Sequence, residues 1–183
     1  MLRSYCVLTL ALLGVGLTVA QSADPVLSDA DQLKASLVNW EQAREECGGD
    51  YSYQVRWSSA FGFGHTTTIT VQGNKVVERK YVEFGQPEPV KPGEAPAEPK
   101  PKWVEMGKEL GTHKEGTAGR TMDELYAEAK KLLEKDLPGH ERRSLAFDQQ
   151  GLLNYCFTRD TRIADDSPLS GIAAFQLQLK AKQ

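Results

Sequence analysis

The sequence contains few of the residues that mark the common classes of functional protein. Its 183 residues include three cysteines, three histidines and 8% aromatic residues. The formal net charge is −3, which disfavours a nucleic-acid binder because such proteins present a basic face to phosphate groups. The chain has no Walker, zinc-finger or nucleophile-elbow spacing. No motif therefore identifies a biochemical activity, and we assign no cofactor.

The longest apolar run lies at the N-terminus. Val7 to Ala20 is almost wholly apolar, follows Arg3 and ends in a small residue before the composition becomes polar at Asp24. This pattern is typical of a secretory signal peptide. A membrane anchor is the alternative, but the run is shorter than the ~20 residues that a spanning helix needs. We predict a signal peptide over residues 1–20, a secreted or periplasmic mature chain, and no stable membrane span after cleavage.

Two cysteines remain once Cys6 leaves with the signal peptide. An even pair in an oxidising compartment favours a disulfide, so we predict a Cys47–Cys156 bridge. Its loop of roughly 110 residues would make the bridge worth about 4–5 kcal/mol in a chain-entropy model. The alternative is two buried free thiols.

Two segments have the signals of capped amphipathic helices. Ser28 and Asp31 resemble a capping box before an apolar stripe, and Gly48-Gly49 ends this helix over residues 28–46. Thr121-Met-Asp-Glu124 is a stronger capping box, and the helix that it opens ends before Pro138-Gly139.

The remaining patterned segments alternate apolar and polar residues, which is the period of a half-buried strand. Gly73-Asn74 and the Asp148–Gly151 segment are turn signals between successive strands. The predicted strands are 51–57, 66–72, 75–84, a short strand at 103–104, 144–147, 152–158 and 171–180. This order predicts an α+β fold, with an antiparallel sheet of about six strands and two packing helices.

A proline-rich segment interrupts the pattern at residues 86–102, which hold six of the nine prolines. We interpret it as a loop inserted into a single domain over residues 21–183, because the first three strands need further cover for their apolar faces. A spacer is favoured over a docking strip for a proline-recognising partner.

Taken together, several short motifs resemble a family of small secreted bacterial proteins of unknown function. The resemblance covers roughly residues 35–180, and the order of the motifs is more specific than any one of them. The motifs are Asp50-Tyr-Ser-Tyr53, the Val71-to-Val77 hairpin, Thr121-Met-Asp-Glu-Leu-Tyr126, Phe147-Asp148, Asp160 and Ile163-Ala-Asp-Asp166. Members usually carry cysteines shortly after the Tyr-x-Tyr strand, whereas Cys47 precedes it here. The resemblance implies a secreted α+β domain with no established activity and no functional residues to transfer.

One loop has the composition of a binding feature. Phe61 and Phe63 alternate with Gly62 and Gly64, and two aromatic side chains in a loop could form a protruding apolar tip that enters a partner's groove. The favoured alternative is that both rings fold back over the sheet, because exposed apolar tips are uncommon on monomers.

Candidate metal ligands are sparse. Asp160, Asp165 and Asp166 form the densest carboxylate cluster and could hold Ca²⁺, but they lack EF-hand spacing and lie among arginines. A solvated turn with local ion pairs is favoured. His65, His113 and His140 are not spaced as zinc ligands.

The sequence therefore favours a secreted or periplasmic binding domain without catalytic activity, whose partner is an unidentified protein or surface rather than nucleic acid. An extracellular hydrolase is the first alternative, with a site built from acids and histidines distant in sequence, such as His113 and Asp166. A calcium- or mineral-associated extracellular protein is the second.

Overall fold

The computed structural model describes residues 27–85, 100–163 and 168–181. Within these ranges the chain forms two α-helices, α1 (Asp29–Glu46) and α2 (Met122–Glu134), and a short 3-10 turn follows the fourth strand at Gly107–Glu109. The strands are β1 (Tyr51–Ser58), β2 (Gly64–Gln72), β3 (Lys75–Phe84), β4 (Trp103–Met106), β5 (Glu141–Phe147), β6 (Leu153–Asp160), β7 (Ser170–Ile172) and β8 (Phe175–Leu179).

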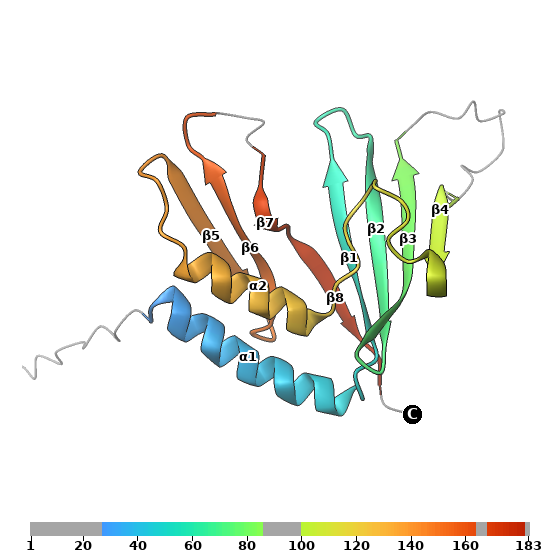
Figure 1. Ribbon diagram of the computed structural model, residues 1–183, viewed down its shortest axis with the longest axis horizontal. Coiled ribbons are helices and arrows are strands. Elements are labelled where there is room, and N and C mark those ends of the chain that lie inside the picture. Colours follow the sequence, from blue (N-terminus) through green and yellow to red (C-terminus); the bar gives the residue numbers. More distant parts are fainter. Residues whose placement is uncertain (1–26, 86–99, 164–167, 182–183) are drawn as a thin grey trace, which may run out of the picture.

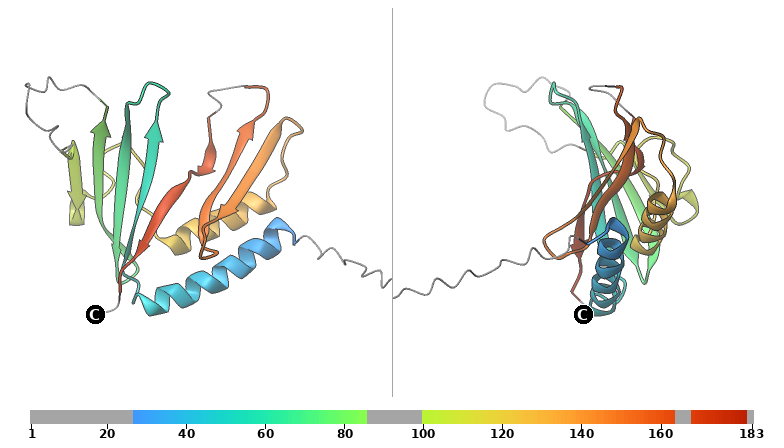
Figure 2. Two further views of the ribbon diagram at one scale, coloured as in Figure 1. Left: turned by 180° about the vertical axis from the view of Figure 1, so that it is seen from behind. Right: turned by 90° about the vertical axis from the view of Figure 1, so that its left-hand side faces the viewer.

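The strands form two antiparallel sheets. The larger sheet has the order β4-β3-β2-β1-β8 and the smaller one the order β5-β6-β7. Both helices lie on the same side of these sheets, toward one end of the strands (Figures 1 and 2). The α+β class and the two helices are as predicted. The predicted strand count is too low, because the described residues contain a five-stranded and a three-stranded sheet.

The predicted C-terminal strand over residues 171–180 is in fact two strands. Ser170 of β7 pairs with Thr158 of β6, whereas Phe175 of β8 pairs with Val55 of β1. The chain therefore leaves the smaller sheet and joins the larger one between residues 172 and 175. Gly171 permits the close packing of β7, because a Cβ atom there would lie 2.6 Å from the carbonyl oxygen of Cys156.

Both helices begin at their predicted caps. The Ser28 side chain accepts a hydrogen bond from the Asp31 backbone N–H at the start of α1. At α2, Thr121 and Glu124 each accept a hydrogen bond from the other's backbone N–H, which completes the capping box. These contacts satisfy amide groups that have no partner inside the helix.

The core lies between the helices and the inward-facing residues of the strands. Its buried tyrosines keep their hydroxyl groups hydrogen-bonded, as buried polar groups require. Tyr51 accepts from the Met122 backbone N–H at 2.8 Å, and the Tyr126 hydroxyl lies 2.7 Å from the Ser36 hydroxyl. These bonds connect β1 to α2 and α2 to α1.

A single carboxylate joins three elements at the edge of this core. Asp123, in the first turn of α2, accepts hydrogen bonds from Trp40 Nε1 at 2.6 Å and from Arg44 Nη1 at 2.8 Å, both on α1. It also accepts one from Asn74 Nδ2 in the β2–β3 turn at 3.0 Å. Asp123 therefore fixes both helices and this turn relative to one another.

The predicted Cys47–Cys156 disulfide is wrong, since both cysteines are buried free thiols. Cys47 is the C-cap of α1. Cys156 on β6 lies near the opposite end of α1: burial raises the pKa of its thiol, and the Asp29 carboxylate adds to that increase. The 18-residue helix places its two ends about 27 Å apart, whereas a disulfide requires Cα atoms within about 7 Å.

Candidate functional site

Aromatic rings in successive contact, some stacked and some tilted, cross the inner, helix-facing side of the larger sheet and form what we call the aromatic row. Cross-strand pairing aligns them, because Trp57 lies opposite His65 and Tyr81 lies opposite Trp103. Distances between neighbouring ring centroids range from 4.6 Å for Trp103–His113 to 6.2 Å for Phe63–Trp57. The row runs in the order Phe63, Trp57, His65, Tyr81, Trp103, His113.

The middle of the row is buried and its ends are exposed. Tyr81 and Trp103 are buried and His65 is partly buried, while Phe63 and Trp57 toward one end and His113 at the other reach solvent. Burial lowers the pKa of His65, opposed by the Glu83 carboxylate. The most exposed aromatic surface of the row therefore lies at its two ends.

The exposed end near the β1–β2 connection contains three large side chains, Trp57, Phe61 and Phe63, which we call the aromatic tip. Their exposed fractions are 52%, 89% and 46% respectively. The expectation that both phenylalanines fold back is wrong for Phe61, and Phe63 is only half covered, by its contact with Trp57. The structure thus supports the alternative of a protruding apolar feature.

Hydrogen bonds close the backbone turn that carries Phe61 and Phe63. The Ser59 backbone N–H donates to the Phe63 carbonyl at 2.9 Å, and the Gly62 N–H donates to the Ser59 carbonyl at 3.2 Å. The Ser59 hydroxyl donates to the Phe63 carbonyl at 3.1 Å and accepts from the Phe61 N–H at 3.3 Å. Gly62 takes φ +83, a conformation that glycine adopts without steric cost.

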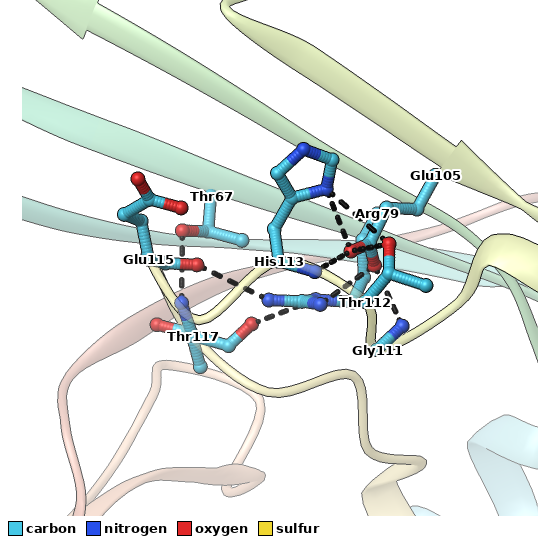
Figure 3. Close-up of polar contacts among 8 residues, drawn as sticks. All are labelled: Thr67, Arg79, Glu105, Gly111, Thr112, His113, Glu115 and Thr117. Atoms are coloured by element: carbon cyan, nitrogen blue, oxygen red, sulfur yellow. Dashed lines mark hydrogen bonds and ion pairs between the residues drawn. The ribbon is translucent and has the colours of Figure 1, made fainter.

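A buried ion cluster lies beside the other end of the row (Figure 3). Glu105 of β4 has no exposed surface, and Arg79 of β3 is 3% exposed. Arg79 Nη1 donates to Glu105 Oε2 at 2.6 Å. The other donors to this carboxylate are the Gly111 N–H at 2.7 Å, the Thr112 hydroxyl at 3.1 Å, the His113 N–H at 2.6 Å and His113 Nδ1 at 3.0 Å.

These hydrogen bonds keep Glu105 ionised. Burial by itself raises the pKa of this carboxyl group, but the bonds from His113, Gly111 and Thr112 outweigh burial and lower the pKa to about 2. A carboxylate can only accept hydrogen bonds, so His113 carries a proton on Nδ1. Its Nε2 atom is then the ring nitrogen available for proton transfer when the ring is neutral.

The cluster fastens residues 107–120 onto the sheet. Arg79 Nε donates to the Thr117 carbonyl at 3.0 Å, and the Thr117 N–H donates to Thr67 Oγ1 at 3.0 Å. Gly116 allows this approach, because a Cβ atom there would lie 2.5 Å from Thr67 Oγ1. A cavity of about 390 Å³ remains under the segment, lined by Val76, Arg79, Leu110, Gly111, His113, Lys114, Gly116, Ala118 and Gly119.

The predicted calcium ligands have a different role where they are described. Asp160 forms an ion pair with Arg162 at 2.6 Å, and the hydrogen bonds from Arg162 lower the pKa of Asp160 to about 2. This is the local ion pair that the sequence favours over a metal ligand. Asp165 and Asp166 lie outside the described residues.

The three histidines are not gathered into one site. Tyr81 and Trp103 lie between His65 and His113 in the aromatic row, and His140 precedes β5. Among the described residues, no group of three His, Cys, Asp or Glu side chains could hold a metal ion.

Arg79 and Glu105 are the site residues that the sequence analysis missed. They occupy inward-facing strand positions, two residues from Tyr81 and Trp103 respectively, and are directly paired across β3 and β4. The pair could have been found from sequence as two opposite charges at facing, inward positions of neighbouring strands. Finding it requires the register between β3 and β4, which the intervening proline-rich segment leaves undefined.

Comparisons with protein-family models, with curated proteins and with solved structures find no match to this chain. None of the described helices is long and apolar enough to cross a membrane.

Proposed function

We propose that this chain is an exported, non-catalytic protein that binds its partner through the aromatic tip. The observation that carries the proposal is the 89% exposure of Phe61 beside the half-exposed Trp57 and Phe63. Contiguous exposed apolar surface on a soluble protein commonly marks an interaction site. Aromatic side chains also dominate the free energy of binding at such sites.

The rigidity of the tip supports the same conclusion. Binding is weakened by the entropy lost when side chains and loops become ordered. The turn from Ser59 to Phe63 is already closed by hydrogen bonds between its two ends, and the Trp57 ring is stacked on His65. A partner would therefore meet a turn whose backbone is already hydrogen-bonded and two rings, Trp57 and Phe63, that already contact neighbouring rings.

The exported location rests on the sequence of residues 1–20 and on the resemblance to small secreted bacterial proteins. The mass of the protein isolated from the extracellular or periplasmic fraction of its host is the direct test. A mass that matches a start near Gln21 supports export, and an uncleaved mass contradicts it.

The binding role is tested by capture of partners from that same fraction with immobilised protein. We expect Phe61→Ser/Phe63→Ser to lose the captured partner. Val38→Ser is the matched control, because Val38 is 60% exposed on α1 and lies outside the tip. Equal capture by wild type and the tip variant would remove the aromatic tip from the proposed function.

A hydrolase is the second candidate, and one contact favours it. The buried Glu105 carboxylate orients the His113 imidazole at 3.0 Å, an arrangement that suits general acid–base catalysis. The test is a broad hydrolase screen with His113→Ala, and with His140→Ala as the control. Turnover abolished by the first variant and kept by the second would favour the enzyme over the binding protein.

A further inference from the structure

We infer that the aromatic tip inserts into the interfacial region of a lipid bilayer, so that the partner in the proposed function is a membrane surface. The inference rests on that proposed function and names its partner. It is carried by the composition of the tip, its internal hydrogen bonds and its place in the molecule.

The first observation is the absence of charge. Residues 57–74 contain no Asp, Glu, Lys or Arg, and the nearest flanking charges in the sequence are Arg56 and Lys75. Moving an ionised side chain out of water is costly, and this segment has none to move. Trp57, Phe61 and Phe63 are of the types that favour the membrane–water interface and the outer acyl region.

The second observation concerns the backbone of the tip. Unsatisfied N–H and carbonyl groups oppose transfer into lipid. Here the Ser59 N–H and the Phe63 carbonyl bond to each other, the Gly62 N–H bonds to the Ser59 carbonyl, and the Phe61 N–H bonds to the Ser59 hydroxyl. The turn can therefore enter an apolar environment with these groups already paired.

The third observation is position. The β1–β2 connection lies at the end of the strands opposite to the helices, in all three views of the molecule (Figures 1 and 2). Strand β6 ends and strand β7 begins at the same end (Figure 1), and Ile163 and Leu169, which follow β6 and precede β7, are exposed. Because the sequence between these strands also contains Asp165 and Asp166, insertion is assigned to the β1–β2 tip alone.

The charge balance defines the type of membrane binding. A chain of net charge −3 gains no general attraction to anionic lipids, so its binding is apolar rather than electrostatic. We therefore expect binding to zwitterionic phosphatidylcholine vesicles that is insensitive to salt, because screening acts on interactions between exposed charges.

The test is flotation of the exported form, which begins near Gln21, with phosphatidylcholine vesicles at low and at 0.5 M salt (about a 4 Å screening length at the higher value), with tryptophan emission recorded in parallel. Trp40 and Trp103 are buried, so a blue shift on adding vesicles reports Trp57. We expect Phe61→Ser/Phe63→Ser to lower the partition coefficient at least about tenfold, because each ring contributes roughly a factor of ten or more when buried. Val38→Ser should bind as wild type does.

Wild type and variants all lack the apolar residues 1–20, so this segment does not contribute to vesicle binding. If the double variant unfolds, Phe61→Ser alone replaces it in the test, because this single variant keeps the contact between Phe63 and Trp57. No flotation of wild type, equal flotation of wild type and tip variant, or loss of flotation at 0.5 M salt (strong screening) would each overturn the inference.

The outcome is separable from that of the proposed function. Tip-dependent capture of a protein without vesicle binding would keep the binding role and replace the membrane by a protein partner. If the tip variant keeps both partner capture and flotation, both proposals are contradicted.

Discussion

The carboxylate of Glu105 is the most heavily coordinated polar group of the described residues that form the site. It has no contact with solvent and accepts from five donor groups, one of them the buried guanidinium of Arg79. Removing one partner of a buried ion pair leaves the other charge uncompensated, which is more costly than losing a surface pair.

We therefore expect Glu105→Gln to lower the free energy of unfolding by about 3–5 kcal/mol. Urea unfolding followed by circular dichroism measures this change. Glu83→Gln is the control, because Glu83 pairs with Lys102 at the surface at 2.8 Å, and surface pairs contribute about 0–1 kcal/mol. Equal losses in the two variants would show that the buried pair contributes no more than the exposed one.

The lowered pKa of Glu105 also allows a prediction of how the stability of the protein depends on pH. Its pKa is about 2 in the folded protein, against an ordinary value of 4.5. The folded state therefore holds the proton more weakly than the unfolded state, and this contribution to stability is complete above pH 4.5 and lost as the pH falls toward 2. Melting temperatures across this range should fall less steeply for Glu105→Gln than for wild type. Parallel slopes would assign the acid sensitivity to other groups, such as Asp160.

At this scale the sequence predicts the caps but not the ion cluster. Ser28 and Thr121 are identifiable because a cap depends on residues three positions away. Arg79 and Glu105 become partners only through strand pairing across residues 86–102, and the predicted strand at residues 103–104 ends before Glu105. Phe61 and Phe63 were identified as candidates by composition, whereas their exposure depends on the turn that Ser59 closes.

Among the elements, the two helices and the β2–β3 turn depend on one side chain. Asp123 joins α1, α2 and Asn74 through the hydrogen bonds described above. Its loss would also leave the indole N–H of the fully buried Trp40 without that partner.

We expect Asp123→Ala to destabilise the protein by about 2–4 kcal/mol, since hydrogen bonds to charged groups contribute about 1.5–3 kcal/mol and an orphaned buried donor adds to the loss. Chemical denaturation is the measurement. Glu41→Ala, at an exposed position of α1, should change stability by less than about 0.5 kcal/mol. A loss at Asp123 as small as at Glu41 would show that the three elements hold together without this carboxylate.

The strands also show which part of the fold cannot be predicted from alternating sequence patterns. Alternation identifies strands because side chains point to opposite faces in turn. The alternating apolar residues of the predicted strand share one phase, but of these only Phe175 is buried, and the buried Ile172 lies out of phase with it. The phase changes where the chain passes from β7 to β8 and so changes sheets. Alternation alone does not report which strand each residue pairs with.

For the molecule as a whole, the cysteines provide a direct test of the packing. Cys47 and Cys156 lie near opposite ends of α1. We expect both to be alkylated in unfolded, unreduced protein and both to be protected in the folded protein, because they are buried. Mass spectrometry of the labelled peptides distinguishes the two positions. Labelling that appears only after reduction would mean that the helix and β6 are arranged differently from this fold.

The arrangement of β1 has a consequence for how the protein is made. One of its neighbours, β2, follows directly in the chain. The other is β8, which is distant in sequence, so Tyr51 pairs with Leu179 only after the intervening chain has been made. Contacts this distant in sequence slow folding. The strands β1 to β4 can pair in the order of the chain, whereas the larger sheet gains its fifth strand only after the segments of α2 and the smaller sheet have been synthesised.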